Sequence, residues 1–135
     1  MKPRVLLETI VVLRLLLADH PEHYERALGL FQTAEAERIT LILTTEILAE
    51  CVHVLRSFYE QSPEEIASLL QKCLRLPGVA GSEPDVQNKT LELYRKTGLD
   101  IADCILAARA QAGGYSVASF DRDFRRFPEV EAFAF

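Results

Sequence analysis

Short apolar runs in this chain alternate with longer segments in which apolar residues recur every three or four positions. The runs Arg4–Leu7 and Ile39–Leu43 are typical of buried strands, and a brief third strand is expected at residues 79–80. Alternating apolar and polar residues predict a later strand over Tyr115–Ser119, and Val130–Phe135 is compatible with a last one.

Helical periodicity fills the segments between these strands, and its limits carry recognisable capping residues. Helix starts are predicted at Pro21, at Thr44 or Thr45, at the capping box Ser62-Pro63-Glu64-Glu65, at Pro84 and at Asp100, and helix ends at Pro77-Gly78, Gly98 and Gly113-Gly114. Buried strands that alternate with helices predict an α/β fold whose mainly parallel sheet is covered by helices on both faces.

Length and composition favour a single globular domain over residues 1–135. Apolar residues make up 49% of the chain, which is enough for one hydrophobic core. The three cysteines, Cys51, Cys73 and Cys104, form no C-x-x-C pair and each lies in an apolar helical pattern, so we expect free core thiols in a reducing cytoplasm. No segment is long and apolar enough to predict a membrane span.

The net charge of -5 argues against a protein that holds nucleic acid mainly by charge. A small, local nucleic-acid site remains compatible with it. The chain contains neither a P-loop nor a G-x-G-x-x-G motif, and its histidines, His20, His23 and His53, share no site by spacing.

Four acidic residues are candidates for a common site. Glu8 follows the first strand and Asp121 follows the Tyr115–Ser119 strand, so their side chains meet if these two parallel strands are neighbours. Asp103 lies in the first turn of the helix that leads into the late strand, and Glu50 lies at the border of the apolar stripe of a helix, where we expect it half-buried.

Carboxylates gathered in this way repel one another, and a divalent cation removes that repulsion. A set of oxygen ligands favours Mg²⁺ or Mn²⁺. The chemistry that requires such a set is the hydrolysis of a phosphodiester bond. Arg122 and Arg126, close to Asp121 in the sequence, are candidates for contacts with substrate phosphates.

The sequence resembles the PIN domain and, within that family, VapC-like toxins of prokaryotic toxin–antitoxin pairs. The resemblance covers nearly the whole chain and depends on the segments "VLLETIVVLRLLLADHPEH", "TTEILAECVHVLRSFY", "GLDIADCILAARAQAGG" and "SVASFDRDFRRFP". It implies a three-layer α/β/α fold and a Mg²⁺- or Mn²⁺-dependent endoribonuclease. By motif position, the family's catalytic acids fall on Glu8, Glu50, Asp103 and Asp121. The resemblance also implies an RNA substrate, an antitoxin partner and a homodimer.

The first motif departs from the family pattern. The family usually has Asp-x-Asn where this chain has Glu8 and Ile10. Glu8 extends one methylene further, and Ile10 removes an amide that would orient the first carboxylate. A PIN-like module that binds RNA or protein without cleaving it is therefore the alternative. A third interpretation is a structural α/β domain whose acids pair with arginines, such as Glu50 with Arg14.

The stretch "SFDRDF" at residues 119–124 closes the predicted site. We expect Asp121 to be a ligand, whereas Asp123 faces water or caps the turn. Phe120 and Phe124 are expected to anchor this turn in the core. The hydroxyls of Thr9, Thr45 and Ser119 lie near the predicted ligands in sequence.

Overall fold

A parallel sheet of three short strands organises the first two thirds of the chain. The computed structural model describes residues 1–135 and contains the strands β1 (Arg4–Leu6), β2 (Thr40–Leu43) and β3 (Val79–Gly81), in the order β1-β2-β3. In the register of these strands, Arg4 lies opposite Thr40, and Leu41 lies opposite Val79. The sheet and the six helices around it confirm the predicted α/β class.

The helices begin and end close to the residues that the sequence predicts. They are α1 (Thr9–Leu17), α2 (Pro21–Glu35), α3 (Thr45–Ser57), α4 (Pro63–Leu74), α5 (Pro84–Thr97), α6 (Ile101–Gly113) and a short 3-10 helix, η1 (Arg122–Arg126). None of them is both long enough and apolar enough to cross a lipid bilayer.

Side-chain caps explain where several helices start. At α4, the Ser62 hydroxyl accepts a hydrogen bond from the Glu65 N–H and the Glu65 carboxylate accepts one from the Ser62 N–H, so the predicted capping box is confirmed. The Thr44 hydroxyl caps α3 by accepting a hydrogen bond of 3.3 Å from the Ile47 N–H. At the other end, Gly98 and Gly114 adopt the left-handed conformation that terminates α5 and α6, with φ angles of 64° and 68°.

The hydrophobic core lies between the sheet and the helices and includes all three cysteines. Cys51, Cys73 and Cys104 are fully buried and unpaired, which confirms the expectation of core thiols. Leu41 and Leu43 of the central strand β2 are also fully buried, whereas Thr40 and Ile42, which alternate with them, are half-buried.

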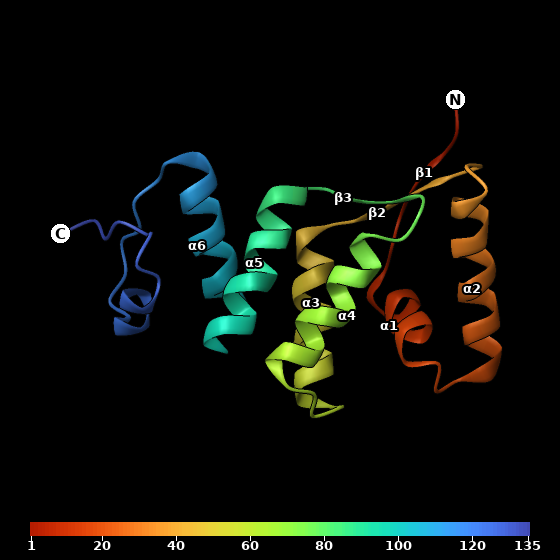
Figure 1. Ribbon diagram of the computed structural model, residues 1–135, viewed down its shortest axis with the longest axis horizontal. Coiled ribbons are helices and arrows are strands. Elements are labelled where there is room, and N and C mark those ends of the chain that lie inside the picture. Colours follow the sequence, from red (N-terminus) through yellow and green to blue (C-terminus); the bar gives the residue numbers. More distant parts are fainter.

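The late strands of the prediction do not join this sheet. Residues 115–119 and 130–135 are linked only by an isolated parallel bridge between Val117 and Ala132, so the expectation of neighbouring strands was wrong. Helix α6 packs against α5 and α3. Figure 1 shows the segment after α6 at the end of the molecule opposite to β1. Strand β1 therefore forms an edge of the sheet.

The aromatic residues of "SFDRDF" occupy different environments. Phe124 packs against the core and makes a tilted ring contact with Phe127, which is fully buried. Phe120 is 94% exposed, so the prediction that it anchors the turn in the core was wrong. Its ring instead contacts Phe135 edge to face at a centroid distance of 5.0 Å, within the C-terminal segment.

Candidate active site

Glu8 lies at the carboxyl end of β1, where it caps α1. Its backbone is extended, and one carboxylate oxygen accepts a hydrogen bond from the Ile10 N–H. The side chain is exposed, and its second oxygen makes no hydrogen bond. A local helix cap is therefore sufficient to orient Glu8, and one carboxylate oxygen remains free for another partner.

Glu50 lies on α3 in the same neighbourhood as Glu8. Burial first, and then the charges of Cys73, Glu50 and Glu8, raise the pKa of the Cys51 thiol to about 12. Glu8 caps α1, and α1 packs against α3, so Glu8 and Glu50 belong to neighbouring helices. Glu50 is exposed, so the expectation that it is half-buried was wrong. Arg14, the partner considered for it, pairs with Asp19 at 3.4 Å.

Asp103 and Asp121 form a second group of acids around the start of α6. Burial raises the pKa of the half-buried Asp103, and the negative charges of Asp100, Asp121 and Asp123 raise it further. Asp121 caps η1, because its carboxylate accepts a hydrogen bond of 2.8 Å from the Asp123 N–H. Asp123 itself is exposed, as expected.

The structure thus places the four predicted acids in two pairs, with Glu8 near Glu50 and Asp103 near Asp121. No group of three or more His, Cys, Asp or Glu side chains lies close enough together to hold a metal ion. Within one chain in this arrangement, the acids therefore do not fit a divalent cation. The shared site of all four acids stays a prediction.

A network of polar side chains that the sequence analysis did not identify joins the carboxyl ends of β2 and β3 to α6. Arg109 of α6 donates two hydrogen bonds to the Glu83 carboxylate, at 2.7 and 3.3 Å, and the Thr45 hydroxyl donates another at 2.6 Å. Glu83 lies two residues beyond β3, as Glu8 lies two residues beyond β1, so the strand-end rule that selected Glu8 would also have selected Glu83. Arg109 gave no such signal, because its partner lies 26 residues away in the chain.

The network makes stability depend on pH. Hydrogen bonds from Arg109 and then from Thr45 lower the pKa of Glu83 below its ordinary value. A carboxylate whose pKa is lowered by folding stabilises the folded state at pH values above its ordinary pKa. This stabilisation is lost as the pH falls through the pKa of Glu83 in the folded state. We expect Arg109→Met to reduce the free energy of unfolding at pH 7 by up to about 1 kcal/mol, because the pair is partly exposed. In urea unfolding, the deficit should shrink at pH 3.

The exposed Arg38, which makes no ion pair, provides the control for this prediction. Arg38→Met removes the same charge and should change stability by less than about 0.5 kcal/mol at both pH values. A deficit of Arg109→Met that is equal at pH 7 and pH 3 would contradict the role assigned to Glu83.

Comparison with known families identifies the chain. A model of the PIN domain matches residues 5–130, a range that includes both pairs of acids. The chain belongs to the PIN-domain family. Among solved structures, it is similar to VapBC2 from Rickettsia felis bound to a DNA fragment from its promoter, with 22% identity over 97% of each chain and a TM-score of 0.38. No curated protein matches it in sequence.

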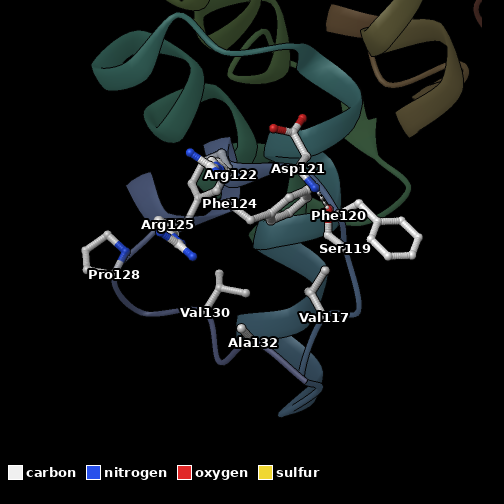
Figure 2. A pocket seen from close by; sticks show the side chains of 11 residues that line it. Val117, Ser119, Phe120, Asp121, Arg122, Phe124, Arg125, Pro128, Val130 and Ala132 are labelled. Carbon is white, nitrogen blue, oxygen red and sulfur yellow. Dashed lines mark hydrogen bonds between the residues drawn. The ribbon is translucent and has the colours of Figure 1, made fainter. Parts of the chain in front are cut away.

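Basic residues flank the second acid pair of this PIN domain. Arg122 and Arg125 line a hollow of about 410 Å³ formed by the C-terminal segment, whose apolar lining includes Val117 and Val130. Figure 2 shows the Asp121 carboxylate on the side of this hollow away from Val130, with Arg122 and Arg125 at its rim. Arg126 does not line the hollow, and its guanidinium donates to the Thr97 carbonyl at 3.2 Å.

A second hollow lies beside the first acid pair. It measures about 360 Å³ between α1 and α2, and its lining includes Glu8, Ile10, Arg14, His23 and Arg26. The surface around Glu8 therefore combines one carboxylate with basic and apolar groups.

The three hydroxyls near the predicted ligands have different partners. Thr45 donates to Glu83, and Ser119 accepts a hydrogen bond of 2.9 Å from the Asp121 N–H. Thr9 is 3% exposed, and its hydroxyl has no hydrogen-bond partner. A buried polar group without a partner is uncommon in proteins, and the side-chain oxygen of Gln61 is the other such atom in this chain.

Proposed function

We propose that this protein is an endoribonuclease of the VapC type, the toxin of a toxin–antitoxin pair. The observation that carries the proposal is the match of the PIN-domain model to residues 5–130. This range contains all four acids, which lie in the sequence motifs that resemble those of VapC-like toxins. The acids would act as one set on an RNA phosphodiester bond, since each pair alone provides only two carboxylates.

The cofactor we propose is Mg²⁺ or Mn²⁺. Both cations prefer oxygen ligands, and the four side chains Glu8, Glu50, Asp103 and Asp121 offer carboxylate oxygens alone. The two pairs are separate within one chain, so binding of the cation requires that they be brought together. The elevated pKa of Asp103 is in keeping with a carboxylate that gains from a positive neighbour.

RNA would be held locally by the basic residues next to Asp121. Arg122 and Arg125 line the hollow of the C-terminal segment and are exposed, so they are available to phosphate groups. Arg126 is exposed too, although its guanidinium already donates to a backbone carbonyl. With a net charge of -5, the chain as a whole would repel RNA, so these side chains would determine where it binds.

The partner we propose is an antitoxin that inhibits the nuclease in the cytoplasm. Its C-terminal segment would lie across the acidic surface and present a basic side chain to the carboxylates. The hollow beside Glu8 has apolar residues such as Val11 and Leu30, which would accommodate apolar side chains of such a segment.

The second candidate function is an RNA- or protein-binding PIN domain without nuclease activity. It is favoured by Glu8 and Ile10, which replace the Asp-x-Asn pattern of the family. Ile10 is 45% exposed, so its side chain contributes little to the core and can be exchanged. This makes the first motif suitable for a direct test.

Cleavage of RNA in Mg²⁺ or Mn²⁺ by the natural chain and by the variant Glu8→Asp/Ile10→Asn separates the two functions. We expect the natural chain to cleave and the variant to cleave about 10-fold faster or more, because the restored amide orients the first carboxylate. Adding Asp121→Asn to either chain should abolish cleavage. Cleavage by the double variant alone would identify the natural chain as the binding module, and cleavage by neither would refute the nuclease.

A further inference from the structure

Two arginines of η1 form a short basic row on the surface of the C-terminal segment. Arg122 and Arg125 are three positions apart, and a 3-10 helix has three residues per turn, so both side chains project from the same side of η1. At a rise of about 2 Å per residue, they are offset by about 6 Å along its axis. Both are exposed and neither forms an ion pair within the chain, so both guanidiniums are free to bind an anion.

The acidic side chains closest to this row in the sequence do not neutralise it. The Asp121 carboxylate accepts the hydrogen bond that caps η1, and Figure 2 shows it on the side of the hollow away from Val130. Asp123 projects from a different side of η1 than Arg122, because they are not three positions apart. Glu129 pairs with a lysine of α5 at 3.3 Å.

Flat apolar surface lies next to the basic row. Phe120 lines the hollow of the C-terminal segment, and its ring is 94% exposed. The edge-to-face contact with Phe135 holds this ring while leaving most of it open to solvent. Phe124 and Val130 also line the hollow (Figure 2), whose volume of about 410 Å³ is in the range of pockets that bind small organic groups.

These features together favour a ligand that carries flat apolar rings and several negative charges. An inorganic anion would contact the arginines alone, and an uncharged apolar molecule would contact the hollow alone. A row of two guanidiniums matches an anion whose charge is repeated along its length. A strand of nucleic acid has one base and one phosphate in every unit, so it can contact the ring and the row at the same time.

The bases of such a strand must be unpaired to reach the hollow. In a duplex, the flat face of each base is covered by its neighbours, whereas the bases of a single strand can stack on aromatic side chains. Phosphate contacts of two arginines are too few to hold a duplex against a net charge of -5. Stacking supplies the additional affinity.

We propose that the C-terminal segment binds single-stranded RNA, with an unpaired base stacked on Phe120 at the mouth of the hollow and phosphates on Arg122 and Arg125. This site explains why so large an apolar side chain as Phe120 is exposed. It makes Phe120 the residue that selects unpaired over paired RNA. The identity of the strand as RNA rests on the proposed function, whereas the binding requires neither a metal ion nor cleavage.

Fluorescence anisotropy in EDTA measures this binding without cleavage by a metal-dependent nuclease, because the chelator removes divalent cations. Three probes are compared: a fluorescein-labelled RNA of about 12 nucleotides, the same RNA annealed to its complement, and a strand of equal length without bases. We expect the natural chain to bind the single strand at least about 5-fold more tightly than either of the others. Equal binding of the three probes, or no binding of the single strand, would overturn the inference.

Phe120→Ala tests the stacked base. It should weaken binding of the single strand by about 5-fold or more and leave binding of the strand without bases unchanged. Because the side chain is almost fully exposed, the variant should keep the midpoint of urea unfolding of the natural chain. The control Phe58→Ala removes a ring that is 77% exposed at the end of α3, and it should bind all probes as the natural chain does. If the two variants bind the single strand equally well, no base stacks on Phe120 and the inference fails.

Arg122→Gln/Arg125→Gln tests the basic row. Phosphates are present with and without bases, so this variant should weaken binding of both strands by a similar factor. The slope of log affinity against log salt concentration should fall by about 1.4, the value for two phosphate contacts of a single strand. Arg4→Gln/Arg38→Gln removes the same charge from two exposed arginines without ion pairs and should leave this slope unchanged. Equal losses in both variants would show that net charge alone matters and would overturn the site.

Cleavage measured in Mn²⁺ separates a failure of this site from a failure of the nuclease. A chain that cleaves RNA but binds the three probes equally in EDTA would refute the site and leave the nuclease standing. A chain that binds the probes as expected but cleaves nothing would support the site, refute the nuclease and favour the RNA-binding alternative.

Discussion

Replacement of Asp103 by Asn is expected to abolish RNA cleavage and, at the same time, to stabilise the protein. Loss of a residue that only orients a metal ligand typically lowers activity by about 10–100-fold. Loss of the proposed ligand Asp103 itself should lower the cleavage rate by more than that. Burial and three neighbouring acids raise the pKa of Asp103, so its charged form destabilises the fold at pH 7. The neutral amide removes this repulsion. Urea unfolding and RNA cleavage, both at pH 7, measure the two effects.

Asp100→Asn is the matched control for this prediction. Asp100 caps α6 by accepting a hydrogen bond of 3.0 Å from the Ala102 N–H, and asparagine caps a helix equally well. This variant removes one negative charge from the same cluster without removing a predicted ligand, so cleavage should stay within about 3-fold of the natural rate. Cleavage by Asp103→Asn at the rate of Asp100→Asn would exclude Asp103 from the site.

Replacement of Gln87 by Leu should destabilise the protein by more than a typical surface substitution. Gln87 is fully buried, and its amide donates to the Leu43 carbonyl at 2.8 Å and accepts from the Glu83 N–H at 3.2 Å. Leucine has a similar size but leaves the Glu83 N–H without a partner, whereas the Leu43 carbonyl keeps its hydrogen bond of 3.0 Å from the Ser82 N–H. We expect the free energy of unfolding to fall by about 1–3 kcal/mol, the cost of one buried donor without a partner. Urea unfolding at pH 7 measures the loss.

The neighbouring Asn88 provides the control. It is exposed, and its amide donates only to the Pro84 carbonyl within the same helix. Asn88→Leu should change the free energy of unfolding by no more than about 0.5 kcal/mol. If the midpoint of Gln87→Leu lies within error of that of Asn88→Leu, then Gln87 does not hold α5 to the end of β2.

Local signals in the sequence account for the parts of the fold that were predicted correctly. Pro21, Ser62 and Glu65 mark helix starts, because a cap depends on residues within one turn of each other. Gly98 and Gly114 mark helix ends for the same reason. Such contacts join residues that are close together in the sequence, so the sequence of one chain is enough to reveal them.

The order of strands depends on contacts that no local pattern encodes. Alternation over residues 115–119 correctly indicates extended backbone, but only one bridge, from Val117 to Ala132, forms within the chain. The packing of α6 against α5 decides where residues 115–119 lie relative to the sheet. For the same reason, the sequence indicated the four acids as a set but did not predict that they lie in two pairs.

Exposure of single side chains was the least predictable property. Glu50 lies at the border of an apolar stripe, where a small rotation of α3 decides between burial and exposure, and it is exposed. Phe120 is apolar, and Phe124, four positions later, packs against the core, yet Phe120 is 94% exposed. Its exposure depends on how the whole C-terminal segment is placed, which the hydrophobic pattern does not contain.

The absence of a cluster of three or more acids has a consequence for the folding energetics of this chain. Side chains that are well apart and share no hydrogen-bond partner contribute independently to stability, so the effects of changes in the two acid pairs should add.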